Sequence, residues 1–364
     1  MNKVRVGVIG GGLISQVEHL PNLLAMPERF EVAGLADPSA KVRAHLSERH
    51  GTPTFATADE LFSQPLDAVV IATPDATHAE LAIAALDRGL HVFCEKPLCY
   101  AVEDADRVAV ARDRAGRVMQ VGYMKRFDPS WQALREMVQG RGERLRMITV
   151  EVNDPGSWPF TDHHDFLPGD DVPPAQIEDV AKRRTEQTAR AISRPLSGAE
   201  LKGFTGPLCS SMVHDINAVH GLLEAMDLAT GEIAGAAVFA DGAGAQGLIR
   251  LSPGGALWSV FHLTVPKLAD YFEKVTLFFD DRIFELRFPS PYLNHLPTEL
   301  IEKRSDGLHL ETILHRHSYR EAFVEELRAF HTSIVDGARV LNPVEDARAD
   351  MALLGAIGRK AFGV

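Results

Sequence analysis

Three consecutive glycines near the start of the chain constrain its fold more than any other feature. They lie between the short apolar run 4–9 and a segment, 13–26, that has the pattern of a helix. A strand, a glycine-rich turn and a helix in this order form the phosphate-binding unit of a dinucleotide-binding fold. Gly10 permits the tight turn, and Gly12 lets the backbone approach a pyrophosphate at the helix N-terminus. Ser15 takes the third glycine position of this motif as a small residue.

Apolar runs alternate with helical patterns up to Gly122. Strands are expected at 32–36, 67–72, 91–94 and 118–121, and helices at 39–50, 78–88 and 103–115. This alternation predicts a parallel sheet with helices on both faces. Asp37 ends the second strand, where a carboxylate can accept hydrogen bonds from both ribose hydroxyls of NAD. The alternative for Asp37 is a cap of the helix that begins near Ser39, and Lys41 and Arg43 keep NADP as the alternative cofactor.

The pattern changes after Gly122. Longer, alternating strands are expected at 147–152, 233–240, 247–251, 257–265 and 275–280. Their direct succession is typical of antiparallel hairpins. We therefore predict an α/β protein with an N-terminal Rossmann domain, a doubly wound parallel sheet over 1–122. An α+β domain with an antiparallel or mixed sheet should follow over 123–364. The helices expected at 318–336 and 345–361 can pack back on the first domain.

Lys96 lies in the run Cys94-Glu95-Lys96-Pro97, which follows a predicted strand. Ligands of open α/β sheets bind outside the carboxyl ends of the strands, so a lysine here can reach a substrate beside the cofactor. Pro97 restricts Lys96 to an extended backbone. Hydride transfer from a secondary alcohol needs a proton acceptor, and a lysine can serve where burial or positive charge lowers its pKa. The competing interpretation is a surface lysine before a turn.

A set of motifs in a fixed order carries a resemblance to a known family. The set comprises Gly10-x-Gly12, Asp37, Ala72-Thr73-Pro74, His78, Glu95-Lys96-Pro97 and Gly122-Tyr123-x-x-Arg126-Phe127. In order and in spacing it resembles the glucose-fructose oxidoreductase, inositol dehydrogenase and MocA (Gfo/Idh/MocA) family of oxidoreductases. The match is close through Phe127 and looser beyond it.

This resemblance implies a Rossmann domain followed by an α/β domain with a mostly antiparallel sheet, through which relatives pack as dimers or tetramers. It implies cofactor contacts from the loops that follow the parallel strands, namely from Gly10, Gly12, Leu13, Ile14, Asp37, Ala72, Thr73, Pro74, His78, Glu95 and Lys96. We therefore expect NAD as the cofactor, Lys96 in the active site, and a homodimer or homotetramer.

A second part of the site is expected in segment 210–217, which has the pattern of the start of a helix. Ser210 and His214 lie four residues apart and would share a helix face that Asn217 extends. The segment resembles the family pattern D-x-x-x-H-[DE]-x-D, so the resemblance matches His214 to the catalytic histidine. Ser210 and Asn217 replace the acids of that pattern, and serine brings hydrogen bonds without charge. The implied catalytic residues are Lys96, His214 and Ser210; the alternative for His214 is a helix-cap or core histidine.

The stretch 153–207 is rich in proline, glycine and charge, which predicts a long insertion with a helix near 176–192. Long loops of this kind often form lids, and their aromatic and polar side chains suit sugar recognition. The residues expected to bind substrate are Lys96, Tyr123, Arg126, Trp158, Asn217 and His214. For Arg126, an ion pair with an acid is an equal alternative. His163-His164-Asp165 offers metal ligands, but adjacent histidines do not easily bind one ion, so no metal site is expected.

Composition limits the partners. The formal net charge of −12 opposes binding to the phosphates of nucleic acids. No stretch reaches the ~18 apolar residues of a membrane span, and the start of the chain lacks the pattern of a targeting segment. Three cysteines do not make a disulfide framework. A small-molecule substrate and a cytoplasmic location are therefore expected.

These observations predict an NAD(P)-dependent oxidoreductase. Its substrate would be the secondary hydroxyl or ketone of a sugar or an inositol-like cyclitol, with Lys96 and His214 handling the proton. One alternative is an NAD-dependent glycosidase that works by transient oxidation, and another is a keto-sugar reductase of a biosynthetic pathway. A sensor that binds the dinucleotide without catalysis is the third, but it would have no need of Lys96.

Overall fold

The computed structural model describes residues 3–364, and their contacts divide the chain into two compact units. The first unit takes in the chain up to Gly122 together with residues 162–191 and 326–351. The second unit takes in residues 123–161, 192–325 and 352–364. The expected division at Gly122 coincides with the first boundary between the units. Residues 162–191 and 326–351 also belong to the first unit, so a single boundary does not separate the two units. The domains 1–122 and 123–364 therefore stay a prediction.

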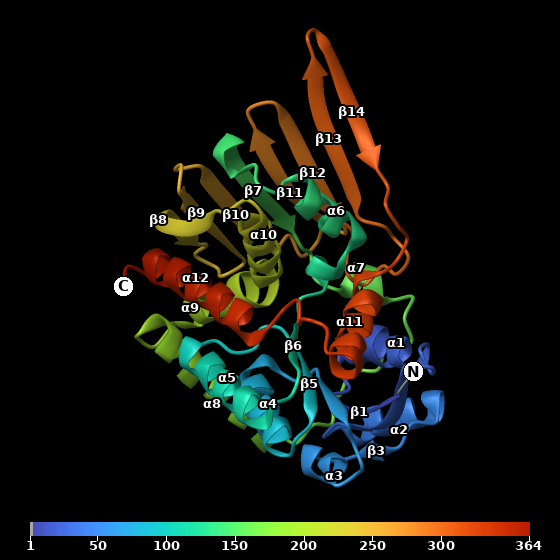
Figure 1. The fold of residues 1–364 in the computed structure, drawn as a ribbon. Coiled ribbons are helices and arrows are strands. Elements are labelled where there is room, and N and C mark those ends of the chain that lie inside the picture. Colours follow the sequence, from blue (N-terminus) through green and yellow to red (C-terminus); the bar gives the residue numbers. More distant parts are fainter. Residues whose placement is uncertain (1–2) are drawn as a thin grey trace. The chain divides into compact units, whose positions relative to one another are not determined.

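A six-stranded parallel sheet forms the core of the first unit (Figure 1). Its strands are β1 (Val4–Ile9), β2 (Phe30–Ala36), β3 (Thr54–Phe55), β4 (Ala68–Ile71), β5 (His91–Glu95) and β6 (Met119–Gly122). The order β3-β2-β1-β4-β5-β6 reverses between β1 and β4, where ligands of such sheets bind. Residues of β4 are all buried, as a sheet covered on both faces requires. The predicted doubly wound Rossmann sheet is confirmed.

Helices and short turns connect these strands. The helices of this part of the chain are α1 (Leu20–Leu24), α2 (Ala40–His50), α3 (Ala58–Phe62), α4 (His78–Asp87), α5 (Val102–Ala115) and α8 (Pro174–Ile192). The turn after β1 continues into a π-helix, η1 (Ser15–His19), before α1 begins. Pro21 lies near the start of α1, within the helical stretch that η1 begins. The last two helices, α11 (Ala322–Asp336) and α12 (Val344–Phe362), each contribute residues to both units.

An eight-stranded sheet forms the core of the second unit. Its strands are β7 (Leu145–Asn153), β8 (Ala229–Val238), β9 (Gly244–Ser252), β10 (Leu257–Leu263), β11 (Phe272–Phe279), β12 (Arg282–Phe288), β13 (Glu299–Asp306) and β14 (His309–His315). The order is β14-β13-β12-β11-β7-β10-β9-β8. Among the described strands of this second sheet, only β7 and β10 form a parallel pair. The mostly antiparallel sheet is therefore confirmed, and the hairpin β13–β14 lies at one edge of it (Figure 1).

Helices cover one face of this second sheet. They are α6 (Pro129–Met137), α7 (Trp158–Thr161), α9 (Gly198–Gly203) and α10 (Val213–Ala225), and a π-helix, η5 (Phe204–Met212), leads into α10. Helix α6 packs on β12 and β13, and α10 packs on β8. Residues of β10 alternate between buried and half-buried, so one face of the sheet is packed and the other is more open. Within residues 3–364, no helix is long and apolar enough to cross a membrane.

Candidate active site

The loop after β1 has the geometry that a pyrophosphate requires. Gly10 has a φ of 98°, and a Cβ on it would lie 2.4 Å from the carbonyl oxygen of Ala72. The Ser15 hydroxyl donates to the carbonyl of Gly10 at 2.5 Å and closes the turn. A Cβ on Gly12 would meet no atom within 4 Å, and Gly12 is exposed. The loop is therefore pressed against the backbone after β4 at one glycine and open at the other, which fits a bound dinucleotide.

Substituting these two glycines should separate folding from binding. We expect Gly10→Ala to lower the free energy of unfolding by about 1–3 kcal/mol from the positive φ alone, and to displace the Ala72 carbonyl in addition. Gly12→Ala should leave the stability unchanged and weaken NADH binding, because its Cβ would enter the open space. Urea denaturation and NADH titration of both variants make the measurement. Equal losses of stability in the two variants would contradict this account of the loop.

Asp37 joins the phosphate loop to the start of α2. Its Oδ2 accepts a hydrogen bond from Gly11 N at 2.7 Å, and its Oδ1 accepts one from Ser39 N at 2.8 Å. Ser39 is itself the N-cap of α2 and accepts from Val42 N. Asp37 thus holds the residue that caps α2, but the cap itself is Ser39 and not Asp37, which the alternative interpretation expected as the cap. A carboxylate has about four lone-pair positions, so its two oxygens can still accept from ribose hydroxyls.

The other predicted cofactor contacts lie at the same carboxyl edge of the sheet. Leu13 and Ile14 are half-buried beside the glycines. After β4, Ala72 is buried, Thr73 is half-buried and its hydroxyl lies 2.7 Å from that of Thr77, and Pro74 is exposed. Ala72 and Thr73 therefore belong to the loop that Gly10 approaches, and Leu13 and Ile14 directly follow the glycines.

His78 ties two loops of this edge together. One ring nitrogen, Nε2, lies 2.7 Å from the carbonyl oxygen of Thr73, and the other, Nδ1, lies 2.8 Å from that of Pro97. Lys96 is half-buried and stands directly before Pro97, to which it is joined by a cis peptide bond. The ring of His78 is buried, so its contacts are to the protein backbone. We read it as a residue that positions the loop carrying Lys96.

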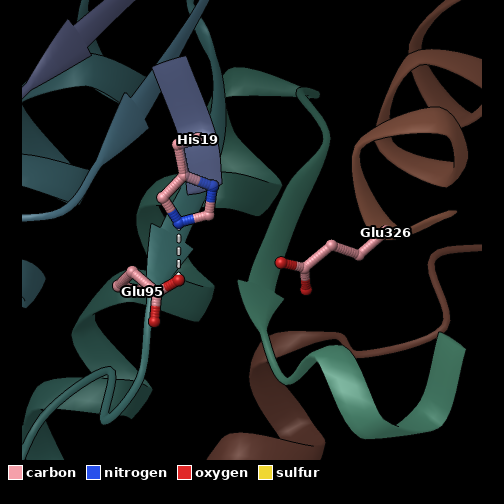
Figure 2. Close-up of side chains that lie close together, drawn as sticks. All are labelled: His19, Glu95 and Glu326. Atoms are coloured by element: carbon pink, nitrogen blue, oxygen red, sulfur yellow. Dashed lines mark hydrogen bonds and ion pairs between the residues drawn. The ribbon is translucent and has the colours of Figure 1, made fainter. Parts of the chain in front are cut away.

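A buried cluster lies behind Lys96, formed by His19, Glu95 and Glu326 (Figure 2). His19 Nε2 lies 2.7 Å from Glu95 Oε1. Burial alone would raise the pKa of Glu95, but the hydrogen bond and charge of His19, followed by the charge of Lys96, outweigh it and lower that pKa. Glu95 is therefore a carboxylate held in place beside Lys96.

Glu326 completes this cluster from α11. Figure 2 shows its carboxyl group directed toward the pair of His19 and Glu95. Burial, and then the charges of Glu95 and Glu18, raise the pKa of Glu326 well above its usual range. One nitrogen and two oxygens of the cluster lie within 4.8 Å of one another, which is a spacing that metal ligands share. The expectation of no metal site stays a prediction.

The second unit holds the remaining predicted residues. The prediction of a helix beginning at Ser210 was wrong, because this residue lies in the π-helix η5 and α10 begins at Val213. Ser210 and His214 therefore lie on either side of the junction between these two helices, and the helix face that they were expected to share stays a prediction. Ser210 is exposed and His214 is half-buried.

The neighbours of His214 are tightly packed. Its ring meets that of Tyr123 edge to face, with 6.5 Å between the centroids. Arg126 is buried, and its Nε donates to the carbonyl of Asn217 at 2.9 Å. The side chain of Asn217 is also buried, whereas Trp158 on α7 is 55% exposed.

Lys125, Asp215 and Glu273 form a buried ion cluster that was not predicted from the sequence. Lys125 Nζ donates to Asp215 Oδ1 at 2.7 Å and also to Glu273 Oε1. The second oxygen of Glu273 accepts from the Tyr271 hydroxyl at 2.8 Å. Burial and then the charge of Glu273 raise the pKa of Asp215 to about 8, against the opposite effect of Lys125. One lysine thus links α10 to β11 inside the unit and anchors the start of the helix that carries His214.

Comparison with known proteins agrees with these motifs. Residues 4–123 match a family model described as an oxidoreductase family with an NAD-binding Rossmann fold. Over these residues the chain matches the Gfo/Idh/MocA family. The resemblance drawn from the motifs is thereby confirmed, as is the NAD-binding character of the first sheet. Inositol 2-dehydrogenase 3 from Saccharopolyspora erythraea is 38% identical over 162 residues, which are 44% of this chain and 48% of that protein. The chain thus spans about half the length of the curated relatives it matches.

Solved structures share the fold over nearly the whole chain. A 3-ketoreductase from Actinomadura kijaniata, solved with NADP and TDP-benzene, is 21% identical with a TM-score of 0.73, covering 98% of this chain and 97% of its own. The UDP-N-acetylglucosamine 3-dehydrogenase from Acidithiobacillus ferrooxidans is 20% identical with a TM-score of 0.71, covering 99% of this chain and 98% of its own. At these identities the likeness shows a common fold.

Proposed function

We propose that this protein is a nicotinamide-dependent dehydrogenase that acts on a secondary hydroxyl, or on the corresponding ketone, of a sugar or cyclitol. The observation that carries the proposal is the carboxyl edge of the first sheet. There an open glycine turn and the carboxylate of Asp37 flank the cofactor position, and Lys96 follows the end of β5. The names of relatives and structural neighbours support a sugar or cyclitol substrate class.

The residues of the edge would divide the work as follows. Gly10, Gly12 and the start of η1 would hold the pyrophosphate, and Asp37 would accept from the ribose. When bound, the nicotinamide ring would take or return the hydride. Lys96 Nζ would take the proton of the reacting hydroxyl, or return it in the reductive direction. Glu95, held by His19 at 2.7 Å, would place a negative charge beside the ammonium group that Lys96 becomes when it has taken the proton.

In the second unit, we propose His214 as a further proton-handling residue and Ser210 as its neutral partner. Tyr123 supports the ring of His214, and Trp158 offers an exposed ring of the kind that covers the apolar face of a sugar. Arg126 and Asn217 are buried, so their proposed part in substrate binding would be to hold the start of α10. Acid–base roles of this kind contribute about 10²–10⁴-fold to a rate.

Nucleotide titration followed by a substrate screen tests this function. NADH and NADPH are titrated first, and inositols, aldoses and keto-sugars are then screened by absorbance at the nicotinamide band. We expect tight NADH binding and turnover of NAD with a polyol. Tight binding without turnover of any candidate would move the assignment to a glycosidase that retains its cofactor. Absence of nucleotide binding would contradict the dehydrogenase.

We further propose a homodimer or homotetramer that packs through the more open face of the eight-stranded sheet. The support is the alternation along β10, which leaves every second residue half-buried in the single chain. A cytoplasmic location is proposed on the buried thiols of Cys94 and Cys99, which suit a reducing compartment.

A further inference from the structure

Residues 162–171, which we call the acidic strap, lie against the cofactor edge of the first unit. The strap contains four aspartates: Asp162, Asp165, Asp170 and Asp171. Gln16 of η1 binds both backbone groups of Leu167, with Nε2 donating to its carbonyl at 2.8 Å and Oε1 accepting from its N–H at 3.0 Å. The same Nε2 donates to the carbonyl of Gly11 at 2.7 Å. The strap is therefore tied directly to the phosphate loop.

The end of the strap fills the N-terminus of α2. Asp171 accepts from the Ser39 hydroxyl through Oδ1 and from Lys41 N at 3.1 Å through Oδ2. Asp170 Oδ1 lies 2.8 Å from Lys41 Nζ. A Cβ on Gly169 would lie 3.1 Å from that of Ser39, so the backbone of the strap also lies close to α2. The hydrogen bond from Ser39 lowers the pKa of Asp171, and the bond to Asp170 raises the pKa of Lys41.

A hydroxyl, a backbone N–H and an ammonium group at a helix N-terminus are the donors that proteins offer to phosphate. Here two carboxylates take all three donors. Arg43 lies near the same helix start, and it donates to the carbonyls of Asp37 at 2.7 Å and Pro38 at 3.0 Å. Lys41 and Arg43, the two cations for which NADP was considered as the alternative cofactor, are thus both hydrogen-bonded to other groups of this chain.

This occupied anion site borders the carboxylate proposed to accept from the ribose. Ser39 donates its N–H to Asp37 Oδ1 at 2.8 Å and its hydroxyl to Asp171. In Rossmann folds, the carboxylate at the end of the second strand hydrogen-bonds the ribose 2′-hydroxyl of NAD, and a nearby cation accommodates the 2′-phosphate of NADP. Ser39 therefore links Asp171 of the strap to Asp37, the carboxylate that would meet the ribose position at which the two cofactors differ.

We propose that Asp170 and Asp171 occupy the place of the 2′-phosphate of NADP and thereby make this chain select NAD. The inference rests on the proposed dinucleotide binding. A 2′-phosphate would have to displace both carboxylates from their donors, and it would meet their negative charge. NAD carries a hydroxyl at this position and leaves the strap in place. The selection comes from a segment 132 residues away from Ser39 in sequence.

The test compares the affinities of the purified protein for NADH and NADPH with those of an Asp170→Asn/Asp171→Asn variant. Both nucleotides are titrated by fluorescence at one ionic strength. We expect NADPH to bind the variant about tenfold more tightly or better, because like charges at a binding site oppose association. NADH affinity should change by less than about threefold, since NADH carries no 2′-phosphate for the two carboxylates to repel.

The matched control is Asp162→Asn/Asp165→Asn, which removes two charges from the same strap. Asp165 lies 3.6 Å from Arg49 and 3.9 Å from His45, away from Ser39, so the control should keep the wild-type ratio of affinities. An unchanged ratio in Asp170→Asn/Asp171→Asn would overturn the strap's role alone, and so would an equal gain for both nucleotides. A wild-type protein that binds neither nucleotide would overturn the proposed function and this inference with it.

Discussion

Replacement of Lys96 by alanine is expected to lower turnover with a polyol by about 10²-fold or more, the scale of a lost acid–base group. Lys96 follows β5 at the carboxyl edge of the sheet, and His78 holds the loop through the carbonyl of Pro97. NADH affinity should stay nearly unchanged, because the dinucleotide would be held at the glycine turn and at Asp37. Steady-state kinetics and NADH titration of the same preparation separate the two effects.

Two further variants make this result specific. Lys182→Ala removes an exposed lysine of α8 and should leave turnover unchanged. Lys96→Arg keeps the positive charge but cannot give up its proton at working pH, so it should remain as slow as Lys96→Ala. Recovery in Lys96→Arg would mean that Lys96 acts by charge alone. Full activity in Lys96→Ala would contradict a catalytic role for Lys96.

Replacement of Lys125 by methionine is expected to lower the free energy of unfolding by about 3–5 kcal/mol, the usual cost of removing one partner from a buried ion cluster. The variant would leave the carboxyl groups of Asp215 and Glu273 without the ammonium group that both now contact. All three side chains are buried. Urea denaturation followed by circular dichroism gives the measurement.

Lys274→Met is the matched control on the same sheet. Lys274 Nζ pairs with Glu151 at 3.2 Å, but both side chains are about a third exposed, so its loss should cost no more than about 1 kcal/mol. Adding Asp215→Asn to Lys125→Met should recover part of the lost stability, because it removes one of the two stranded acids. Equal costs for Lys125→Met and Lys274→Met would show that the buried cluster contributes little.

Much of the first unit could be predicted because its signals are local. The glycine turn, Asp37 at the end of β2 and Lys96 at the end of β5 each depend on a few neighbouring residues. The alternation of strands and helices was likewise readable, whereas the short elements β3 and α3 were missed. In the second unit, β12, β13 and β14 were not foreseen, although the antiparallel character of the sheet was.

The buried partners could not be read in the same way. His19 and Glu326 are polar or charged residues on the buried side of a helix. Such a position indicates that the side chain has a buried partner, but it does not identify that partner. The start of α10 was misplaced because residues 204–212 form a π-helix, which has about one more residue per turn than an α-helix. The residue types in this segment give no pattern that distinguishes the two kinds of helix.

By itself, the sequence determined the Rossmann half of this protein, the cofactor loop and the place of Lys96, because backbone conformation and periodic burial act over short distances along the chain. Only the tertiary structure decided which groups surround them. The pairing of His19 with Glu95, the bond from Lys125 to Glu273 and the bond from Ser39 to Asp171 join residues 76, 148 and 132 positions apart. A hydrogen bond forms where donor and acceptor come within about 3 Å, and a folded backbone, not a local pattern, brings such distant atoms together.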